Sequence, residues 1–374
     1  MSAGISVGVI APGDAPPPPL SGEPTPRRVF LAAAARERVD AVARACAALA
    51  GAGRVRVVAA FSFKTNPGER LIAMARERGF AAEVISPEEL RWARELGFTP
   101  ADTIYNGPLP VGRDVTDEPL GWIFADSLEA YRRNARSGVA RACGARLRPS
   151  MLASRFGVAV DEDDALAGAV AEHGAASPFA VSFHARREDF HGATWRDVAG
   201  DVLRRAAALQ ARAGAHVVGF DAGGGWTPDE FDETFAADIG WLVDRLATEL
   251  PACTTVIVEP GQAVCTPSEA LLTRVLEVRR RGERREVIVD AGYPDWPQMH
   301  AYVHGFFAWR AGGWTPLGRG ADRLGGRTCL EYDVIDGLRF PDDVAEGDAL
   351  MIVGTGSYDR SMAFDFARGT TADV

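Results

Sequence analysis

A single lysine is the first feature of this sequence that could do chemistry. The chain holds 41 lysine and arginine residues, and Lys64, in "VVAAFSFKTNPGER", is the only lysine among them. A guanidinium stays protonated and does not form an imine at a useful rate, so arginine cannot replace a lysine that must do so. A lysine in a partly apolar pocket can lose its proton and attack an aldehyde. Lys64 could instead be a remaining surface charge, but its position after an apolar run favours a reactive amine.

Two further segments have residue types that suit a phosphorylated ligand with a pyridine ring. In "DAGGGW" (221–226), consecutive glycines expose backbone N–H groups that can cradle a phosphate, although tight turns use the same residues. In "VEPG" (258–261), Glu259 could keep a pyridine nitrogen protonated and make the ring an electron sink. It could equally be a capping or salt-bridged glutamate. His184, at the end of "VSFH", could stack on a flat ring or be a core histidine.

The elements that must position these residues alternate in type. Short apolar runs typical of strands are each followed by a stretch with helical spacing. The expected strands are residues 55–63, 80–86, 102–107, 121–127, 144–149, 179–185, 216–225 and 254–261. Eight strands that alternate with helices predict a (β/α)8 barrel. An open doubly wound sheet is the main alternative, but no glycine fingerprint follows the first strand.

The ends of the predicted strands are all polar. Active sites of such barrels are built from the C-terminal strand ends. In chain order these ends carry Lys64, Ser86, Asn106, Asp126, Arg146 or Arg148, His184, Asp221 and Glu259. A buried strand end does not need such a set for stability, so we expect a polar site at this end of the barrel.

Three segments are expected along the chain. Residues 1–27 are a proline-rich leader, whose end is a candidate for joining a β domain. Residues 28–264 are expected to form the barrel. Over residues 265–374 the helical patterns stop, and short alternating runs such as "EVIVDAG", "TCLEYDVI" and "DALMIVGTGSY" predict a C-terminal all-β domain. The expected class is therefore an α/β barrel followed by an all-β domain.

Composition narrows the function classes. The net charge of -10 argues against a nucleic-acid partner. Five scattered cysteines indicate reduced thiols in a cytoplasm. No apolar run approaches the roughly 18 residues of a membrane span, and no signal peptide is recognised. The remaining histidines show no metal-ligand spacing, so no metal site is predicted; they are His173, His191, His216, His300 and His304.

Eleven short motifs occur in the order found in one enzyme family. They are "SFKTNP", "VISPEEL", "IYNGP", "ADSLEA", "SRFG", "SFH", "DAGGG", "EPG", "VDAG", "TCLEYDVI" and "GSYDRSM". The chain thereby resembles the fold-type III pyridoxal phosphate (PLP) decarboxylases, the enzymes similar to diaminopimelate and ornithine decarboxylases. The resemblance implies an alanine-racemase-like PLP-binding barrel, a C-terminal β domain, an amino-acid substrate and a homodimer with active sites at its interface.

The resemblance also assigns roles by position in these motifs. Lys64 matches the lysine that holds PLP as a Schiff base, His184 the histidine stacked on its ring, and Glu259 the partner of the pyridine nitrogen. Other cofactor contacts are expected at the phosphate loop and next to the glutamate, at Gly223, Gly224, Gly225 and Gly261.

Two C-terminal residues complete the expected catalytic set. Cys329 looks like the cysteine that the other subunit supplies, which returns a proton after carbon dioxide leaves. Tyr358, in "GSYD", looks like the tyrosine near the cofactor phosphate.

Four departures from the family pattern bear on substrate and phosphate. Leu330 stands where diaminopimelate decarboxylases have a glutamate and ornithine decarboxylases an aspartate, and Gln298 where the former carry an arginine for the distal carboxylate. Gln262 replaces the arginine of "EPGR", and the phosphate-binding serine after the histidine is replaced near Arg187. Diaminopimelate itself is therefore not the expected substrate.

The segments "TCLEYDVIDGLRF" and "EPGQAV" are closer in texture to carboxynorspermidine decarboxylases, whose substrates are longer amino acids. Glu331 or Asp295 could then read a distant amine. The expected substrate contacts are Gln298, Tyr302, Leu330 and Glu331. The sequence thus predicts a decarboxylase that converts a non-standard or larger amino acid to an amine.

Two alternatives share this fold. Amino-acid racemases or epimerases usually avoid a carboxylate at the pyridine nitrogen, so Glu259 together with Cys329 favours decarboxylation. A non-catalytic PLP-fold binding protein would have no need to keep its only lysine at the imine position.

Overall fold

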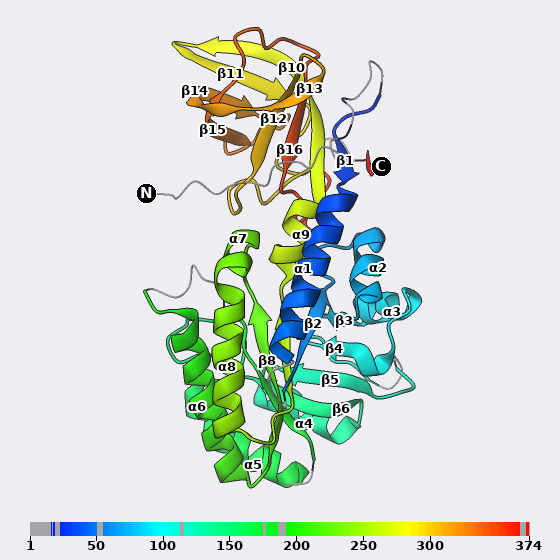
Figure 1. Ribbon diagram of the computed structural model, residues 1–374, viewed down its shortest axis with the longest axis vertical. Coiled ribbons are helices and arrows are strands. Elements are labelled where there is room, and N and C mark those ends of the chain that lie inside the picture. Colours follow the sequence, from blue (N-terminus) through cyan, green and yellow to red (C-terminus); the bar gives the residue numbers. More distant parts are fainter. Residues whose placement is uncertain are drawn as a thin grey trace. The chain divides into compact units, whose positions relative to one another are not determined.

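The computed structural model describes residues 16, 18, 23–50, 55–112, 116–174, 177–185, 192–366 and 372–373. The described residues divide into two compact units (Figure 1). Val39–Lys64 and Gly68–Ala263 form the first, called here the barrel unit. The remaining described residues form the second, the β unit.

The barrel unit is a closed barrel of eight parallel strands in sequential order, from β2 to β9, in which β9 pairs with β2. The strands are β2 (Arg56–Ser62), β3 (Ala81–Val84), β4 (Thr103–Tyr105), β5 (Leu120–Ala125), β6 (Ala140–Arg146), β7 (Phe179–Ser182), β8 (Val217–Gly224) and β9 (Thr255–Glu259). The predicted (β/α)8 barrel is confirmed, and the open sheet is excluded. The sequence pattern placed the start of β6 at residue 144, because the alanines and glycine of "ARACGAR" lack the β-branched signal of a strand.

The helices lie outside the barrel strands (Figure 1). They are α1 (Ala32–Ala50), α2 (Glu69–Glu77), α3 (Pro87–Glu95), α4 (Leu128–Ser137), α5 (Asp163–His173), α6 (Trp195–Ala213), α7 (Pro228–Glu230), α8 (Ala236–Glu249) and α9 (Gly261–Cys265). Several begin at a hydroxyl side chain that accepts a backbone N–H: Ser127 caps α4 and Thr194 caps α6. The same two helices end at glycines in the left-handed conformation, Gly138 and Gly214.

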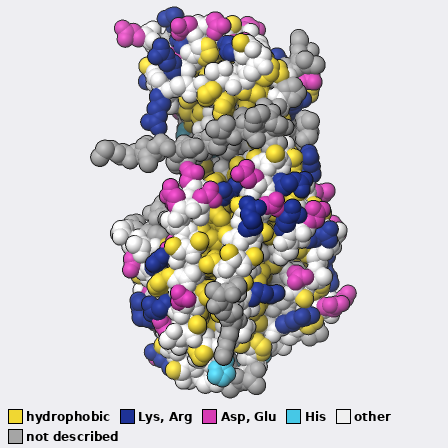
Figure 2. Space-filling model, in the orientation of Figure 1, with side chains coloured by type: hydrophobic (Ala, Val, Ile, Leu, Met, Phe, Trp, Pro, Cys, Tyr) yellow, Lys and Arg dark blue, Asp and Glu magenta, His cyan; other side chains and the backbone are white. Residues whose placement is uncertain are grey.

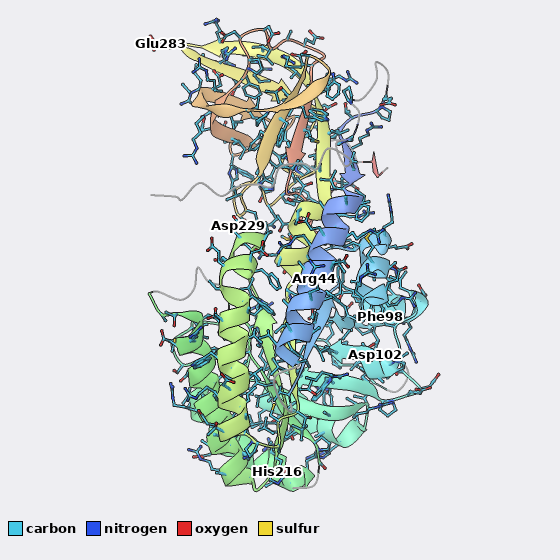
Figure 3. All side chains as sticks on the ribbon, viewed as in Figure 1. Arg44, Phe98, Asp102, His216, Asp229 and Glu283 are labelled. Atoms are coloured by element: carbon cyan, nitrogen blue, oxygen red, sulfur yellow. The ribbon has the colours of Figure 1, made fainter. Side chains whose placement is uncertain are left out.

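Two aromatic side chains of β5 fill the inside of the barrel. Trp122 and Phe124 are parallel, with ring centroids 6.4 Å apart, and pack against small or aliphatic residues of the other strands. Gly219 and Gly144 lie directly against them, since a Cβ at these positions would come within 2.4 Å of Trp122 and 2.6 Å of Phe124. The glycines therefore make room for large rings in a narrow barrel. His216, just before β8, and Asp229, in α7 just after it, mark the two ends of this barrel (Figure 3).

The β unit is built on a nine-stranded sheet that is mostly antiparallel. Its strands are β1 (Arg27–Phe30), β10 (Glu269–Arg281), β11 (Arg284–Val289), β12 (Gly305–Arg310), β13 (Gly313–Pro316), β14 (Gly318–Gly325), β15 (Val334–Arg339), β16 (Ala349–Val353) and β17 (Ala372–Asp373). The predicted C-terminal β domain is confirmed as a fold class. The expected barrel began at residue 28, but β1 (Arg27–Phe30) pairs antiparallel with β10 and therefore belongs to this sheet.

One predicted strand of this unit is wrong. The run "TCLEYDVI" (328–335) alternates like a strand, but β15 begins only at Val334. The side chain of Asp333 accepts hydrogen bonds from the Thr328 backbone N–H at 3.0 Å and from the Thr328 hydroxyl. These bonds close residues 328–333 into a turn, which local alternation cannot reveal.

Charges of both signs are interspersed on the face of the protein that Figure 2 shows. Within the described ranges, none of the helices has the length and hydropathy that crossing a bilayer requires.

A buried ion pair in the barrel unit gives a stability prediction. Arg205 of α6 is bound to Asp163 of α5 at 2.6 and 3.0 Å, and both side chains are at most 10% exposed. Replacing Arg205 by Met should cost about 3–5 kcal/mol of unfolding free energy, because it leaves a buried carboxylate unpaired. Arg212→Met is the matched control: Arg212 and Asp164 pair across the same two helices but are 50% and 89% exposed, so the cost should be ~0–1 kcal/mol. Urea denaturation measures both, and equal losses would contradict the assignment.

Candidate active site

Lys64 follows β2 and is paired with a buried acid, Glu83 of β3. Its Nζ lies 2.7 Å from Oε1 and 2.6 Å from Oε2 of Glu83, and the Ser62 hydroxyl donates a further hydrogen bond to Oε2. Lys64 is 28% exposed, whereas Glu83 is completely buried. Burial raises the pKa of Glu83 to about 7; the charge of Lys64 opposes this rise, and that of Glu259 adds to it. Glu83 therefore changes its protonation state near neutral pH while in contact with Lys64.

A second buried carboxylate, Glu259, lies at the end of β9. Asn106 donates to its Oε1 at 2.9 Å, and His184 Nδ1 lies 3.6 Å from its Oε2. Burial alone would raise the pKa of Glu259, but the interaction with His184 and the charge of Lys64 outweigh it and lower the pKa to about 2. Glu259 is thus ionised at every pH at which the protein would work.

Asp221, on β8, is the third buried carboxylate and behaves in the opposite way. Its Oδ1 accepts the backbone N–H of Gly223 at 2.9 Å, while its Oδ2 accepts no hydrogen bond from a described residue. Burial and then the charge of Glu259 raise its pKa well above the usual range. We infer that Asp221 stays protonated, so that the acids near Glu259 do not repel one another.

The glycine segment after Asp221 is held by close backbone contacts. Gly223 has φ +65°, and a Cβ there would lie 2.5 Å from the Phe183 carbonyl oxygen. A Cβ on Gly224 would lie 2.1 Å from the carbonyl oxygen of Glu259, and its N–H donates to His184 Nδ1 at 3.3 Å. Gly225 has φ +99°. Glycine is required here by packing and backbone conformation, and the same segment forms a side-chain-free cradle beside His184.

These residues fit a PLP group. The only lysine of the chain is partly exposed next to a proton acceptor, an ionised carboxylate suits a protonated pyridine nitrogen, and a glycine cradle suits a phosphate.

Arg146, at the end of β6, is also part of this charge arrangement. Burial lowers its pKa, and Glu259 and Asp126 act against that change.

Two of the predicted residues of the barrel lie at the beginnings of helices. Ser86 caps α3 by accepting the Glu89 N–H at 3.1 Å, so its polarity at the strand end serves the helix. Gly261 begins α9. The replacement near Arg187 lies outside the described residues. The sequence analysis did not recognise Glu83. The signal that could have identified it is an acidic residue within an otherwise apolar strand.

The other predicted residues lie in the β unit, and their roles stay predictions; they are Gln298, Tyr302, Cys329, Leu330, Glu331 and Tyr358. Tyr302 and Tyr358 have ring centroids 6.2 Å apart, and Tyr358 has φ +63°, which is rare for a residue with a side chain. The backbone N–H of Gln298 donates to Asp359 at 2.8 Å.

Cys329, Leu330 and Glu331 belong to the turn that Asp333 closes. Cys329 is a free, exposed thiol, Glu331 is exposed and Leu330 half-buried. The turn thus exposes the Cys329 thiol and the Glu331 carboxylate instead of packing them in the core. Such exposure is required of side chains that contact another molecule.

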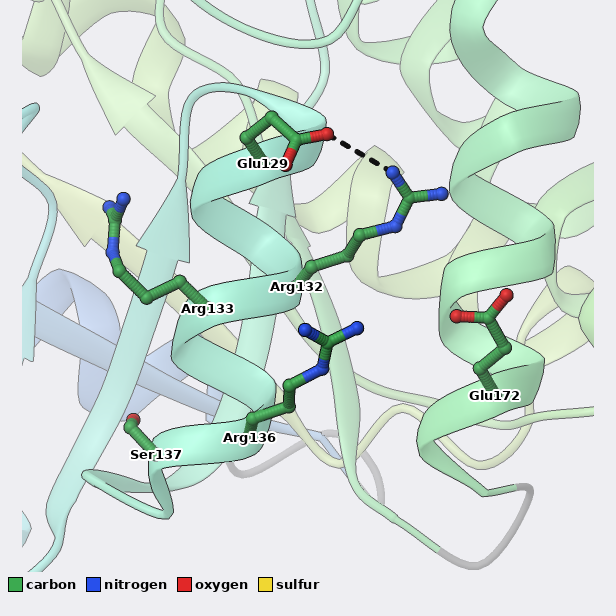
Figure 4. Close-up of a pocket in the computed structure, with 6 residues that line it drawn as sticks. All are labelled: Glu129, Arg132, Arg133, Arg136, Ser137 and Glu172. Carbon is green, nitrogen blue, oxygen red and sulfur yellow. Dashed lines mark hydrogen bonds and ion pairs between the residues drawn. The ribbon is translucent and has the colours of Figure 1, made fainter.

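A groove lies between α4 and α5 of the barrel unit (Figure 4). Arg132, Arg133 and Arg136 line it together with Glu129 and Glu172, and Arg132 is bound to Glu129 at 3.1 Å. The ends of both helices lead into the beginnings of β6 and β7, so the groove lies toward the end of the barrel opposite Lys64. Its mixed charges are typical of a solvated surface.

Comparisons with known proteins agree with this geometry. No family model matches the chain. The chain is similar to diaminopimelate decarboxylase of Actinosynnema pretiosum subsp. auranticum, with 26% identity over 82% of this chain and 75% of the relative. It is also similar to lysine/ornithine decarboxylase of Selenomonas ruminantium, with 24% identity over 82% of this chain and 80% of the relative.

Among solved structures, diaminopimelate decarboxylase from Helicobacter pylori in complex with L-lysine superposes with a TM-score of 0.76 and 19% identity, over 94% of this chain and 92% of that one. The fold is therefore that of these decarboxylases, a PLP-type barrel with a β domain. The chain is a homologue of the fold-type III PLP decarboxylases, which confirms the resemblance seen in the motifs.

The packing explanation of the glycine segment can be tested without cofactor. Gly224→Ala should lower the unfolding free energy of the apo protein by about 1–3 kcal/mol or more, since its Cβ would overlap the Glu259 backbone. Gly168→Ala is the control: a Cβ there, in the middle of α5, meets nothing within 4 Å, and the change should stabilise by ~0.5–1 kcal/mol. If Gly224→Ala left apo stability unchanged, the segment would be free to rearrange.

The raised pKa of Glu83 predicts a pH dependence of stability. The folded state keeps this proton up to about pH 7, whereas the unfolded state loses it near 4.5, so the contribution of Glu83 to stability falls as pH rises between these values. Glu83→Gln should remove that fall. Urea denaturation at pH 5 and pH 7 should show a larger loss for the wild type than for the variant. Glu88→Gln, at an exposed carboxylate of α3, should follow the wild type. Parallel losses in all three proteins would show that Glu83 is not protonated in this range.

Proposed function

We propose that this protein is a PLP-dependent decarboxylase that removes the α-carboxylate of a non-standard or larger amino acid and releases an amine. The observation that carries the proposal is the contact of the only lysine of the chain with a buried glutamate of raised pKa, next to the ionised Glu259. The homologous enzymes are decarboxylases of amino acids, and a solved structure of the same fold, with a TM-score of 0.73, holds PLP.

When bound, PLP supplies an aldehyde for an amine and a ring that takes up the electrons released as carbon dioxide leaves. Where Glu83 is ionised, above about pH 7, it can take the proton of the Lys64 ammonium with which it is in contact. This leaves the neutral amine that attack on a carbonyl requires.

The other barrel residues hold the charges in place. Glu259, fixed by Asn106, can accept a hydrogen bond from a ring nitrogen and so keep that nitrogen protonated. Protonated Asp221 prevents a second negative charge beside Glu259. The ring of His184 offers a flat face at the glycine cradle.

Residues of the β unit are proposed to act at the active site of the homodimer, with Cys329 supplied by the other subunit. Cys329 would return the proton to the carbon that lost carbon dioxide, in line with its free, exposed thiol. Tyr358 would lie near the phosphate, and the substrate side chain would contact Gln298, Tyr302, Leu330 and Glu331. The protein is expected to act as a cytoplasmic homodimer with active sites at its interface, with no nucleic-acid or membrane partner.

The decarboxylase proposal is tested by carbon dioxide release from a panel of amino acids that includes meso-diaminopimelate, lysine, ornithine and longer analogues. Lys64→Ala and Lys64→Arg should both lower the rate by roughly 10³-fold or more, because neither side chain can form the imine. Arg91→Ala, at an exposed position of α3, is the control and should keep the wild-type rate.

Each alternative predicts a different result. A racemase would abolish the optical rotation of a solution of its amino-acid substrate without releasing carbon dioxide. A binding protein would turn over no amino acid, and its Lys64 variants would behave like the wild type. Efficient turnover of meso-diaminopimelate alone would overturn the substrate part of the proposal.

A further inference from the structure

The turn that carries Cys329 is a long hairpin connection in the β unit. Residues 326–333 join β14 to β15, and the two strands stay paired up to both ends of this connection. Hairpin loops usually have about two to five residues. Two backbone hydrogen bonds close this longer one: the N–H of Gly326 donates to the carbonyl oxygen of Asp333 at 2.8 Å, and the N–H of Asp333 donates to that of Leu330 at 3.0 Å. The connection is thus longer than reversal of the chain requires, and its backbone is held in a closed turn.

The carboxylate of Asp333 is the centre of this turn. The residue is only 2% exposed. Its Oδ1 accepts the backbone N–H of Tyr293 at 2.7 Å, and its Oδ2 accepts the Thr328 backbone N–H at 3.0 Å and the Thr328 hydroxyl. The same hydroxyl accepts the backbone N–H of Leu330 at 3.3 Å. Because Thr328 and Leu330 flank Cys329, this network fixes the backbone that carries the thiol.

Two glycines make room for the buried carboxylate. A Cβ on Gly326 would lie 2.1 Å from Oδ1 of Asp333, and a Cβ on Gly292 would lie 2.7 Å from its Oδ2. Burying a carboxylate is costly unless its oxygens are hydrogen-bonded, as they are here. A connection that only reversed the chain would need neither the buried acid nor the two glycines. Their presence indicates that the conformation of the turn itself matters.

Tyr332 holds the turn at a second point. Its carbonyl oxygen lies 2.7 Å from Nε2 of His300, within hydrogen-bond distance. Its ring packs edge-on against Tyr293, with ring centroids 4.9 Å apart, and Tyr293 is also the residue whose N–H binds Asp333. The backbone on both sides of Cys329 is therefore held in place, while the thiol itself is exposed.

We propose that Asp333 is a positioning residue for Cys329, which holds the turn so that the thiol reaches one face of the carbon that has lost carbon dioxide. The inference rests on the proposed function, in which Cys329 gives its Sγ–H proton to that carbon and regains a proton from water. Asp333 is buried and acts through Thr328 and the backbone of the turn. A proton donor that is held by its surroundings in one orientation delivers its proton to one face.

The test is decarboxylation in D2O of an amino acid that the wild type accepts. The amine then carries one deuterium at the carbon that lost carbon dioxide, and the wild type should give a single enantiomer. Thr328→Val keeps the shape of the side chain but removes the hydroxyl, and Asp333→Asn removes the carboxylate. Each should give both enantiomers and lower kcat roughly 10- to 100-fold, because the donor is misplaced. Thr328→Ser restores the hydroxyl and should restore the single enantiomer.

Amide hydrogen exchange gives a second readout that needs neither cofactor nor turnover. Peptides that cover residues 326–333 should exchange faster in Thr328→Val and Asp333→Asn than in the wild type, with the rest of the β unit unchanged. Asp322→Asn is the matched control. Asp322 is a buried carboxylate of β14 that binds Arg285 at 2.7 Å and the Phe340 N–H at 2.9 Å, away from the turn. Its loss should lower stability but leave the enantiomer and the exchange of the turn as in the wild type.

Three results would overturn the inference. A turn that exchanges faster in the variants while they still give one enantiomer at the wild-type rate would leave Asp333 with a structural role alone. Unchanged exchange in both variants would show that Asp333 does not hold the turn. A mixture of enantiomers from the wild type would show that the donor is not positioned at all. Failure of the proposed function would be seen separately, as absence of carbon dioxide release by the wild type; it would remove the reaction that the inference requires, whereas the exchange experiment would still decide whether Asp333 holds the turn.

Discussion

Three buried carboxylates at one end of a barrel, Glu83, Asp221 and Glu259, set the constraint on which the rest of this site depends. Buried like charges cannot all be ionised in a low dielectric. The protein resolves this by giving each acid a different partner: an ammonium for Glu83, the Asn106 amide and nearby His184 for Glu259, and a backbone N–H for Asp221. Burial raises the pKa values of Glu83 and Asp221, whereas His184 and Lys64 lower that of Glu259, so one site holds an ionised carboxylate beside an acid that titrates near neutrality.

The barrel makes this arrangement possible because its strand ends converge from distant parts of the sequence. Glycines at Gly223 and Gly224 let β8 approach His184 and β9 closely enough for the acids to interact. The loop after β6 adds positive charge next to the same histidine, and α6 fixes that loop from outside.

Much of the fold could be predicted from the sequence, because alternation of buried strands and amphipathic helices is a local signal. Lys64 and Glu259 were recognisable for the same reason: each ends an apolar run. Glu83 was missed although an acid within an apolar strand is a signal, because its role depends on the neighbouring strand placing it against Lys64. The turn at residues 328–333 was misjudged because a single side chain, Asp333, overrides local alternation. The sequence marked the end of the leader as a candidate for the β sheet but did not assign residues 28–30 of β1 to it, because the partner strand, β10, lies far along the chain.

The most direct test of the account is borohydride reduction of the purified, PLP-treated protein, followed by mapping of the modified peptide by mass. The account predicts visible absorption that reduction abolishes, with the cofactor mass on the peptide that contains Lys64. Lys64 is the one lysine of the sequence, so labelling at the α-amino group of the protein's N-terminus serves as an internal control. A protein that stays colourless with PLP, or one labelled only at that α-amino group, would contradict the claim that the Lys64–Glu83 pair is built to present a neutral amine to a cofactor.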